Sequence, residues 1–319
     1  GKTTTLRMIS GLEVPTEGEI YFDAANVADL PVQRRNVGMV FQRYALFPHM
    51  TVERNVSFGL RVRGTPKAEV DRRVDEILGV VQLEELRHRF PSQLSGGQMQ
   101  RVAIARTLVT NPSVLMMDEP LANLDTKLRG EMRVFIRGLQ QRLGITTIFV
   151  THDQVEAMEL ADRIAVMFAG KIAQYDTPLN IFHRPASLDV ARFIGAPNLF
   201  EARALSRNGE ATIETPYGTL PVADLNGHAD GERVDAMIRP EAVVLTVAGE
   251  ASQGNLDGRI VSADFFGQAT TYMVDLNGAT IRADEMSNRQ LGVGQPVTVR
   301  LRPEKIWIFP ASRGAAGVN

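Results

Sequence analysis

The sequence contains no cysteine among its 319 residues, so disulfide bonds, thiolate metal sites and thiol catalysis are excluded. No apolar run approaches the roughly 18 residues that a membrane-spanning helix requires. The longest apolar runs, 114–117 and 145–150, have the length of a strand. Basic and acidic residues nearly balance, with a net charge of −2, which argues against a nucleic-acid partner. The 44% of hydrophobic residues can form a large core, and the length favours two domains.

Residues 1 to about 197 alternate helix-like and strand-like segments, as in an α/β layered domain. Within this domain we expect a helical subdomain at about 43–110. The expected helices are 2–11, 51–63, 67–81, 97–109, 126–143 and 154–160, and the expected strands are 19–22, 37–41, 114–117 and 147–150. A hairpin is predicted over 163–175, with its turn at Gly170 and Lys171.

Residues 198–319 lose helical periodicity and read as short strands between Gly, Asn and Pro turns. This pattern predicts a small all-β domain, a barrel or a sandwich. The expected strands are 233–239, 243–247, 256–263, 270–276 and 295–301. Residues 237–241 read Met-Ile-Arg-Pro-Glu and residues 300–304 read Arg-Leu-Arg-Pro-Glu, which predicts two similar β units.

The chain opens on Gly1-Lys2-Thr3-Thr4 and runs directly into a predicted helix. This matches the tail of the phosphate loop GxxxxGK[ST], in which Lys binds terminal phosphates and the next hydroxyl holds Mg²⁺. The alternative is a frayed terminus, and the tripeptide alone favours that alternative. On the motif reading, the chain starts inside its own phosphate loop.

An apolar run at 114–117 delivers two carboxylates, Asp118 and Glu119, at its end. In phosphate-loop enzymes an Asp at this place supports Mg²⁺, and an adjacent Glu can act as general base. A core strand followed by an acidic turn is the competing interpretation.

Leu94-Ser95-Gly96-Gly97-Gln98 precedes a predicted helix. Two glycines and a hydroxyl at a helix start can approach an anion closely. A flexible loop would explain a bare Gly-Gly pair, but not the whole pentapeptide. The pentapeptide resembles the signature motif of ATP-binding-cassette (ABC) ATPases.

Six motifs follow one another in the order that ABC ATPases show. They are Lys2 to Thr4, Gln42, 94–98, Asp118 with Glu119, 121–125, and His152. The resemblance covers residues 1–197 and, more loosely, the β-rich tail. It implies a P-loop NTPase domain followed by an OB/TOBE-like β domain, with ATP and Mg²⁺ as cofactors.

The resemblance also implies individual roles. Lys2 would bind the terminal phosphates, with Gly1 and Thr4 beside the nucleotide. Thr3, Gln42 and Asp118 would hold Mg²⁺. Since relatives carry further loop glycines ahead of this segment, we expect the chain as it stands to bind ATP weakly. Glu119 would be the general base, and His152 the switch histidine that steadies the γ-phosphate.

In this family the signature residues Leu94 to Gln98 act in trans, on the nucleotide held by a second ATPase subunit. The resemblance therefore implies a two-fold pair, most simply a homodimer. Asp125 would link the two sites. Ala122 departs from the Ser that many relatives carry, which concerns loop contacts rather than hydrolysis.

Tyr44, Leu46, Phe47 and Met50 form a dense apolar stretch just after Gln42. They form either the core of the helical subdomain or a groove for a helix of a membrane subunit. The stretch and the β-rich tail resemble importer subunits that handle sugars, polyamines or ferric iron.

The partners implied are two transmembrane permease subunits and, indirectly, an extracytoplasmic solute-binding protein. The implied location is the cytoplasmic face of the inner membrane. Residues 193–200 and the Arg-Pro-Glu ending favour a polyamine or ferric-iron importer, with a sugar importer as the alternative. A non-transport ABC ATPase is the rival, although no coiled-coil insertion or tandem cassette is seen.

Overall fold

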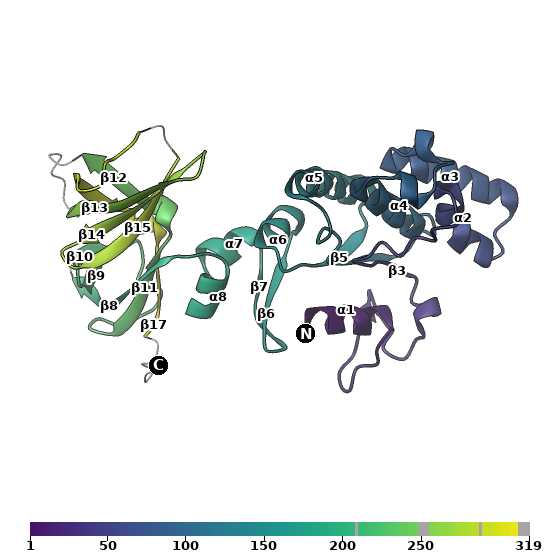
Figure 1. The fold of residues 1–319 in the computed structure, drawn as a ribbon. Helices are drawn as coiled ribbons and strands as arrows, with labels where there is room; N and C mark the ends of the chain where they lie inside the picture. Colours follow the sequence, from purple (N-terminus) through teal and green to yellow (C-terminus); the bar gives the residue numbers. More distant parts are fainter. Residues whose placement is uncertain (208–209, 248–254, 287–288, 312–319) are drawn as a thin grey trace. The chain divides into compact units, whose positions relative to one another are not determined.

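The computed structural model describes residues 1–207, 210–247, 255–286 and 289–311. The chain divides into two compact units, Gly1–Pro178 and Leu179–Asn319 (Figure 1). The first unit mixes helices with a short parallel sheet, and the second consists mainly of antiparallel strands. An α/β unit followed by a β-rich unit is the arrangement that the sequence predicts.

The centre of the first unit is a parallel sheet of β3 (Val37–Val40), β4 (Val114–Asp118) and β5 (Thr146–Val150), with β4 in the middle. Successive side chains of β4 point to opposite faces. Val114 and Met116 pack with Leu6 of the first helix, whereas Leu115 and Met117 belong to the large helical core. All four are buried, which explains why this strand reads as a continuous apolar run.

Three helices share the large core: α2 (Val52–Val62), α3 (Lys67–Val81) and α4 (Gly96–Leu108). The N-cap of α2 is Thr51, whose hydroxyl accepts from the Arg54 N–H at 3.4 Å. Pro66 is the N-cap of α3. Two further helices, α5 (Thr126–Leu143) and α6 (Gln154–Leu160), contribute Met132, Ile136 and Leu160 to the same core.

Helix α1 (Lys2–Ser10) ends at Gly11, whose φ of 82° is left-handed. The buried Arg35 side chain donates to the carbonyls of Met8 and Ile9 in the last turn of this helix, where acceptors lack intrahelical partners. It also donates to the carbonyls of Ala28 and Leu30. A Cβ on Gly11 would lie 2.7 Å from the Arg35 Nε, so only glycine allows this close approach.

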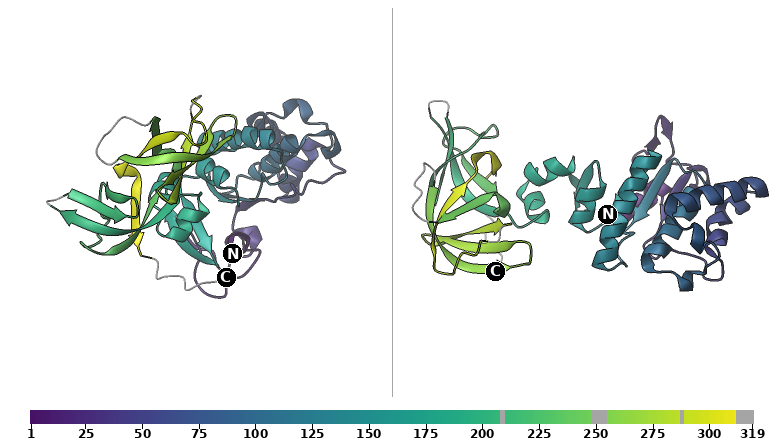
Figure 2. Two further views of the ribbon diagram at one scale, coloured as in Figure 1. Left: turned by 60° about the vertical axis from the view of Figure 1, so that its left-hand side comes forward. Right: turned by 90° about the horizontal axis from the view of Figure 1, so that it is seen from above.

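Two hairpins complete the first unit (Figure 2). The predicted strand at 19–22 is reduced to β1 (Tyr21–Phe22), which pairs with β2 (Ala25–Asn26). The predicted hairpin over 163–175 is confirmed as β6 (Ile164–Phe168) and β7 (Lys171–Asp176). Its turn lies at Ala169 and Gly170, both with positive φ. None of the helices in the described part of the chain is long and apolar enough to cross a bilayer.

The second unit begins with two short helices, α7 (Pro178–His183) and α8 (Leu188–Phe193), that the sequence reading did not anticipate. Helix α8 packs Ala191 against Met237 and Phe309. Arg239 donates to the Phe182 and Ala191 carbonyls and lies over the Phe182 ring. Because these helices pack with the β-rich unit, the boundary between the two units lies before residue 197, the position at which the composition changes.

Two five-stranded antiparallel sheets enclose the core of this unit. One has the order β10-β9-β8-β11-β17, and the other has the order β12-β16-β13-β14-β15. The strands of the first are β8 (Asn198–Arg207), β9 (Glu210–Thr215), β10 (Gly218–Pro221), β11 (Arg233–Ile238) and β17 (Ile306–Pro310). Those of the second are β12 (Val243–Val247), β13 (Asn255–Phe265), β14 (Thr270–Leu276), β15 (Ala279–Glu285) and β16 (Pro296–Leu301).

The two Arg-Pro-Glu segments form matching units. In each, a strand leads through a short 3₁₀ turn, Pro240–Ala242 or Pro303–Lys305, into a strand of the other sheet. The units pair crosswise: β11 pairs with β17, and β12 pairs with β16. The predicted internal repeat is thus present as a pair of interlocked units. Strands β8, β9, β10, β15 and β17 were not among those expected.

Candidate functional site

The predicted nucleotide-binding residues lie around one edge of the parallel sheet, where β3, β4 and β5 end. Gln42 follows β3, Asp118 ends β4, and His152 follows β5. Gly1 is the N-cap of α1, which packs against β4 and β5. Ligands of open α/β sheets bind outside the carboxyl ends of the strands, and helix N-termini favour anions.

Two hydrogen bonds join the first turn of α1 to this edge. The Lys2 Nζ donates to the Thr151 carbonyl at 2.6 Å, and the Thr3 hydroxyl donates to Asp118 Oδ1 at 3.2 Å. Thr4 is exposed on the same turn. The arrangement therefore places a cation, hydroxyls and a carboxylate together, as a site for a phosphate with a hard metal ion needs.

Glu119 and His152 form the second contact at this edge. His152 Nδ1 lies 3.2 Å from Glu119 Oε1, and the histidine side chain is mostly exposed. Glu119 has a left-handed φ of 46°, a rare conformation for a residue with a Cβ. Its N–H donates to the Val150 carbonyl of β5 at 2.9 Å, which holds this backbone in place. The backbone therefore aims the Glu119 carboxylate at the end of β5.

The pentapeptide 94–98 forms the start of α4 and lies apart from these contacts. Ser95 is the N-cap: its hydroxyl accepts from the Gln98 N–H at 3.3 Å, and the Gln98 side chain accepts from the Ser95 N–H at 2.8 Å. A Cβ on Gly96 would lie 2.9 Å from Leu124, so the helix start needs glycine there. Within the described residues, no hydrogen bond joins this pentapeptide to Lys2, Thr3, Asp118, Glu119 or His152.

The segment after Glu119 connects the site to two further elements. Asp125 is the N-cap of α5 and accepts from the Leu128 N–H at 3.0 Å. The Asn123 side chain donates to the Gln42 carbonyl at 2.7 Å, while the Gln42 side chain is exposed. Asn123 was not singled out in the sequence, because a hydrogen bond across such a distance in the chain leaves no local pattern.

The predicted apolar stretch after Gln42 is partly buried. Tyr44 and Leu46 pack against the helical core, and the Phe47 ring lies 4.6 Å from the ring of Phe58, which is partly exposed. Both sequence interpretations keep support: two side chains belong to the core, and an aromatic pair faces outward.

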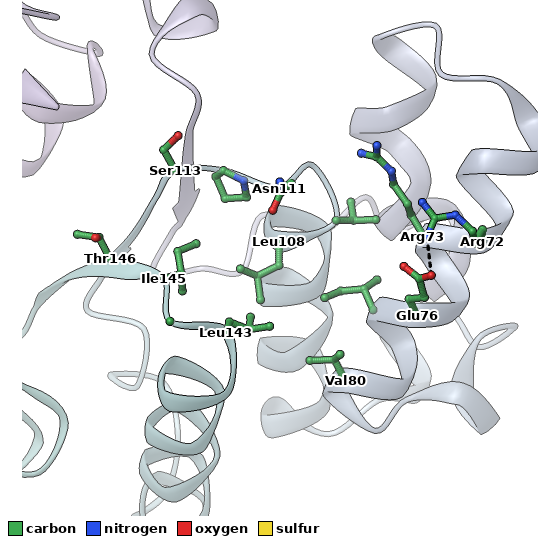
Figure 3. A pocket seen from close by; sticks show the side chains of 14 residues that line it. Arg72, Arg73, Glu76, Val80, Leu108, Asn111, Ser113, Leu143, Ile145 and Thr146 are labelled. Atoms are coloured by element: carbon green, nitrogen blue, oxygen red, sulfur yellow. Dashed lines mark hydrogen bonds and ion pairs between the residues drawn. The ribbon is translucent and has the colours of Figure 1, made fainter. Parts of the chain in front are cut away.

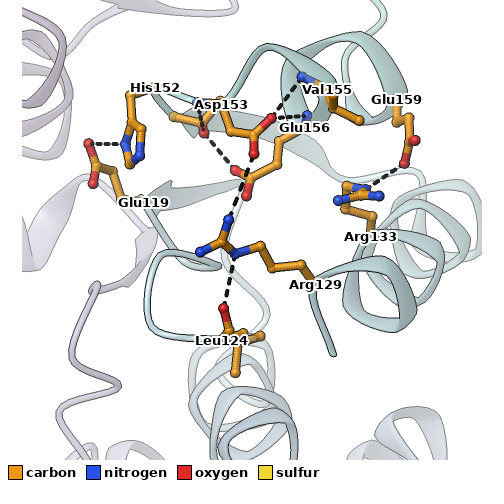
Figure 4. A network of polar contacts seen from close by, with 10 residues as sticks. Glu119, Leu124, Arg129, Arg133, His152, Asp153, Val155, Glu156 and Glu159 are labelled. Carbon is orange, nitrogen blue, oxygen red and sulfur yellow. Dashed lines mark hydrogen bonds and ion pairs between the residues drawn. The ribbon is translucent and has the colours of Figure 1, made fainter. Parts of the chain in front are cut away.

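A polar network behind His152 was also missed by the sequence reading (Figure 4). The Thr151 hydroxyl accepts from the Asp153 N–H at 2.9 Å and donates to Glu156 Oε2 at 2.6 Å. Burial raises the pKa of Glu156, which is only 3% exposed, although the Thr151 hydrogen bond lowers it in part. Thr151 thus connects Lys2, through its carbonyl, to a buried carboxyl group.

We expect Glu156→Gln to stabilise the protein increasingly as the pH rises from about 4 to about 7. A raised pKa in the folded state means that the contribution of Glu156 is fully present below its unfolded pKa and is lost as the pH rises through the folded value. Glutamine keeps an acceptor for Thr151 without the charge. Urea denaturation at several pH values measures this difference in the free energy of unfolding, and a pH-independent difference would contradict it.

A hollow of about 570 Å³ in the first unit lies elsewhere (Figure 3). It is bordered by Arg72 and Glu76 of α3, Leu108 of α4, and Thr146 at the start of β5. That is the amino end of the strands, opposite the edge that carries Asp118 and His152. A hollow of only about 10 Å³ lies beside Glu119 and His152. The chemical groups, rather than the hollow's size, mark the candidate site.

Comparison with known proteins agrees with both units. Residues 1–122 match the family model described as ABC transporter, and residues 236–309 match the TOBE domain. A spermidine/putrescine import ATP-binding protein PotA of Roseobacter denitrificans is 46% identical over 92% of this chain and 81% of its own length. The proteins of the same name from Rubrobacter xylanophilus and Pseudomonas fluorescens are 43% and 44% identical, each over 98% of this chain, and over 85% and 87% of their own lengths.

The predicted ABC and TOBE-like fold classes are therefore confirmed, and so is the predicted ATPase activity. This chain belongs to the family of ABC importer ATPases that carry a C-terminal TOBE domain.

Proposed function

We propose that this ATPase drives the import of polyamines, as part of a complex with two membrane-embedded permease subunits at the cytoplasmic face of the membrane. The observation that carries the substrate class is the identity of 43% to 46%, over most of both chains, to spermidine/putrescine import proteins. An extracytoplasmic solute-binding protein selects the cargo, so the ATPase takes part in import without touching it.

Phosphate binding is assigned to the first turn of α1. Lys2 exchanges its bond to the Thr151 carbonyl for terminal phosphate oxygens, and Thr4 and the N–H groups of the turn face the phosphates further back. Thr3 and Asp118, already in contact at 3.2 Å, would hold Mg²⁺ together with Gln42. Mg²⁺ would neutralise charge on the phosphates. The donor set fits, since Mg²⁺ takes oxygen ligands and is usually bound through one or two carboxylates, here that of Asp118, together with substrate phosphates.

Hydrolysis is assigned to the pair at the ends of β4 and β5. Glu119 accepts the proton of the attacking water as general base. His152, 3.2 Å from that carboxylate, donates a hydrogen bond toward the terminal phosphate and so steadies the developing charge. The contact between the two side chains supports a shared task at one reacting centre.

The signature residues are assigned to the nucleotide of a second copy of this chain. Ser95 to Gln98 lie apart from the contacts made by Lys2 and Asp118 within one chain, which supports a role in trans. ATP then sits between two subunits related by two-fold symmetry, and its binding closes the pair. Asp125, at the start of α5, is assigned to this interface, where it would link the two sites.

The segment that contains Tyr44, Leu46, Phe47 and Met50 is assigned to contact with a permease helix. The buried Asn55 side chain accepts from the Phe47 N–H at 2.9 Å and donates to the Phe47 and Met50 carbonyls at 3.1 and 3.0 Å. A segment held in this way is preorganised for docking, because little entropy is lost on binding.

Reconstitution with the permease pair and binding protein tests the proposed cargo. We expect spermidine or putrescine, presented with the binding protein, to raise ATP hydrolysis and to accumulate in proteoliposomes. Maltose and ferric iron, offered with their own binding proteins, serve as controls. Stimulation by a sugar or iron system, with no response to polyamines, would replace the proposed substrate by that alternative. Association with ribosomes or DNA instead of a permease would contradict import.

A further inference from the structure

The segment that follows Gln42 has an unusual backbone. Tyr44 and Ala45 both have left-handed φ angles, 56° and 50°, and neither is glycine. The Ala45 N–H donates to the Arg43 carbonyl, which closes a tight turn around Tyr44. Side chains with a Cβ disfavour this conformation, so it persists only where surrounding groups hold it.

Arg106 of α4 provides such a group. Its guanidinium donates to the Ala45 carbonyl at 2.6 Å and to the Tyr44 carbonyl at 3.1 Å, and it lies over the Phe47 ring at 5.7 Å. Burial lowers the pKa of Arg106, and no ion pair to an acidic side chain is described for it. The cationic side chain therefore donates to two consecutive backbone carbonyls, each from a different nitrogen of its planar guanidinium.

The other end of the segment is held as well. Asn123, which lies between Glu119 and Asp125 in the sequence, donates to the Gln42 carbonyl at 2.7 Å. Gln42 is thus fixed through its own carbonyl on one side and through the Tyr44–Ala45 turn on the other. Since Arg106 shares a helix with Ser95, the turn is also tied to the signature pentapeptide.

We propose that Arg106 is a positioning residue for ATP hydrolysis, which holds the Tyr44–Ala45 turn and thereby directs the Gln42 side chain. The contact of Arg106 with the turn makes the segment 42–45, the Gln42 segment, move together with helix α4. This inference rests on the proposed role of Gln42 at the nucleotide. It assigns Arg106 no contact with ATP.

A double-mutant cycle between Gln42→Ala and Arg106→Lys tests this inference. Lysine keeps the charge but has one nitrogen in place of two, so it cannot reproduce the fixed geometry of the two guanidinium contacts. We expect each single variant to lower kcat by about 10-fold, and the double variant to match Gln42→Ala alone within about 2-fold, because the two changes act through one group. The Kd for a fluorescent ATP analogue should stay within about 2-fold of the wild-type value in every variant.

Arg101→Lys is the matched control. Arg101 lies on the same helix, donates to the Val81 carbonyl and lies over the Phe135 ring at 4.4 Å, but it does not touch the Gln42 segment. Arg101→Lys should lower kcat only slightly, and in the double variant its fold-reduction in kcat should multiply with that of Gln42→Ala. If the fold-reduction caused by Arg106→Lys also multiplies with that of Gln42→Ala, or if Arg106→Lys leaves kcat unchanged, the inference is wrong.

Ala45→Val covers the case in which Arg106→Lys does not fold. Ala45 is exposed, so valine disturbs no core, yet its β-branch opposes the left-handed φ. It should lower kcat and be non-additive with Gln42→Ala; an additive effect overturns the inference. If both Gln42→Ala and Glu119→Gln hydrolyse ATP at the wild-type rate, the assigned site itself is refuted. If both lose hydrolysis but the effect of Arg106→Lys multiplies with that of Gln42→Ala, only the inference about Arg106 is refuted.

Discussion

Glu119→Gln should lower kcat for ATP hydrolysis by about 100- to 10,000-fold, because glutamine has the shape of the proposed general base but cannot accept a proton. The side chain keeps an oxygen within reach of His152, which now lies 3.2 Å from the Glu119 carboxylate. ATP binding should persist, since Lys2, Thr3 and Asp118 are untouched. An ATP-bound pair of subunits should therefore accumulate, and size-exclusion chromatography with ATP present should detect it.

Glu159→Gln provides the control for this variant. Glu159 lies on the neighbouring helix α6 and also pairs with a cationic side chain, that of Arg133, at 2.6 Å. It is outside the assigned site, so its substitution should leave hydrolysis near the wild-type rate. A Glu119→Gln protein that hydrolyses ATP at close to the wild-type rate would show that another group acts as the base.

Ser95→Asp should lower ATP hydrolysis by about 100-fold or more while preserving helix α4, because aspartate caps a helix as well as serine does. The Ser95 hydroxyl accepts from the Gln98 N–H at 3.3 Å, and a carboxylate can do the same. In the assigned pair of subunits, however, the new negative charge faces the phosphates of the partner's ATP. Rates measured at saturating ATP should fall, and thermal stability should not.

The ATP affinity of the isolated subunit shows whether Ser95 acts on the partner's nucleotide or on the nucleotide of its own subunit. It should remain within about 2-fold of wild type for Ser95→Asp, because the subunit's own nucleotide is held elsewhere. Ser187→Asp is the matched control: Ser187 caps α8 by accepting from the Val190 N–H at 3.3 Å, in the second unit. Equal losses of binding and hydrolysis in Ser95→Asp would place the pentapeptide at its own subunit's nucleotide.

The elements that could be predicted are those with a local cause. The β4 run is apolar throughout because both faces of the strand are buried, and the polar groups that follow it mark where the sheet ends. The capping serine and the glycines at 95–97 similarly predicted the start of α4. In such cases burial and capping act within a few residues, so the sequence carries the information directly.

The parts that escaped prediction depend on distant residues. Glutamate gives no sign of a left-handed backbone at position 119, since the Val150 carbonyl holds it there. Helices α7 and α8 have six residues each, too few for a clear period. Packing against Met237 and Phe309 stabilises α8, and Arg239 holds α7 through the carbonyl and ring of Phe182. Strands such as β17 were missed because the partner, not local composition, defines an edge strand.

The crosswise pairing of the two Arg-Pro-Glu units has a consequence for biosynthesis. As the nascent chain leaves the ribosome, β11 and β12 emerge well before the strands that pair with them, β17 and β16. The sheet that contains β12 cannot be completed until residue 301 has been translated, and the sheet that contains β11 needs residue 310. Until then, unpaired strand edges invite wrong pairing. The second unit must therefore fold late and all at once, while the helical core of the first unit can already be in place.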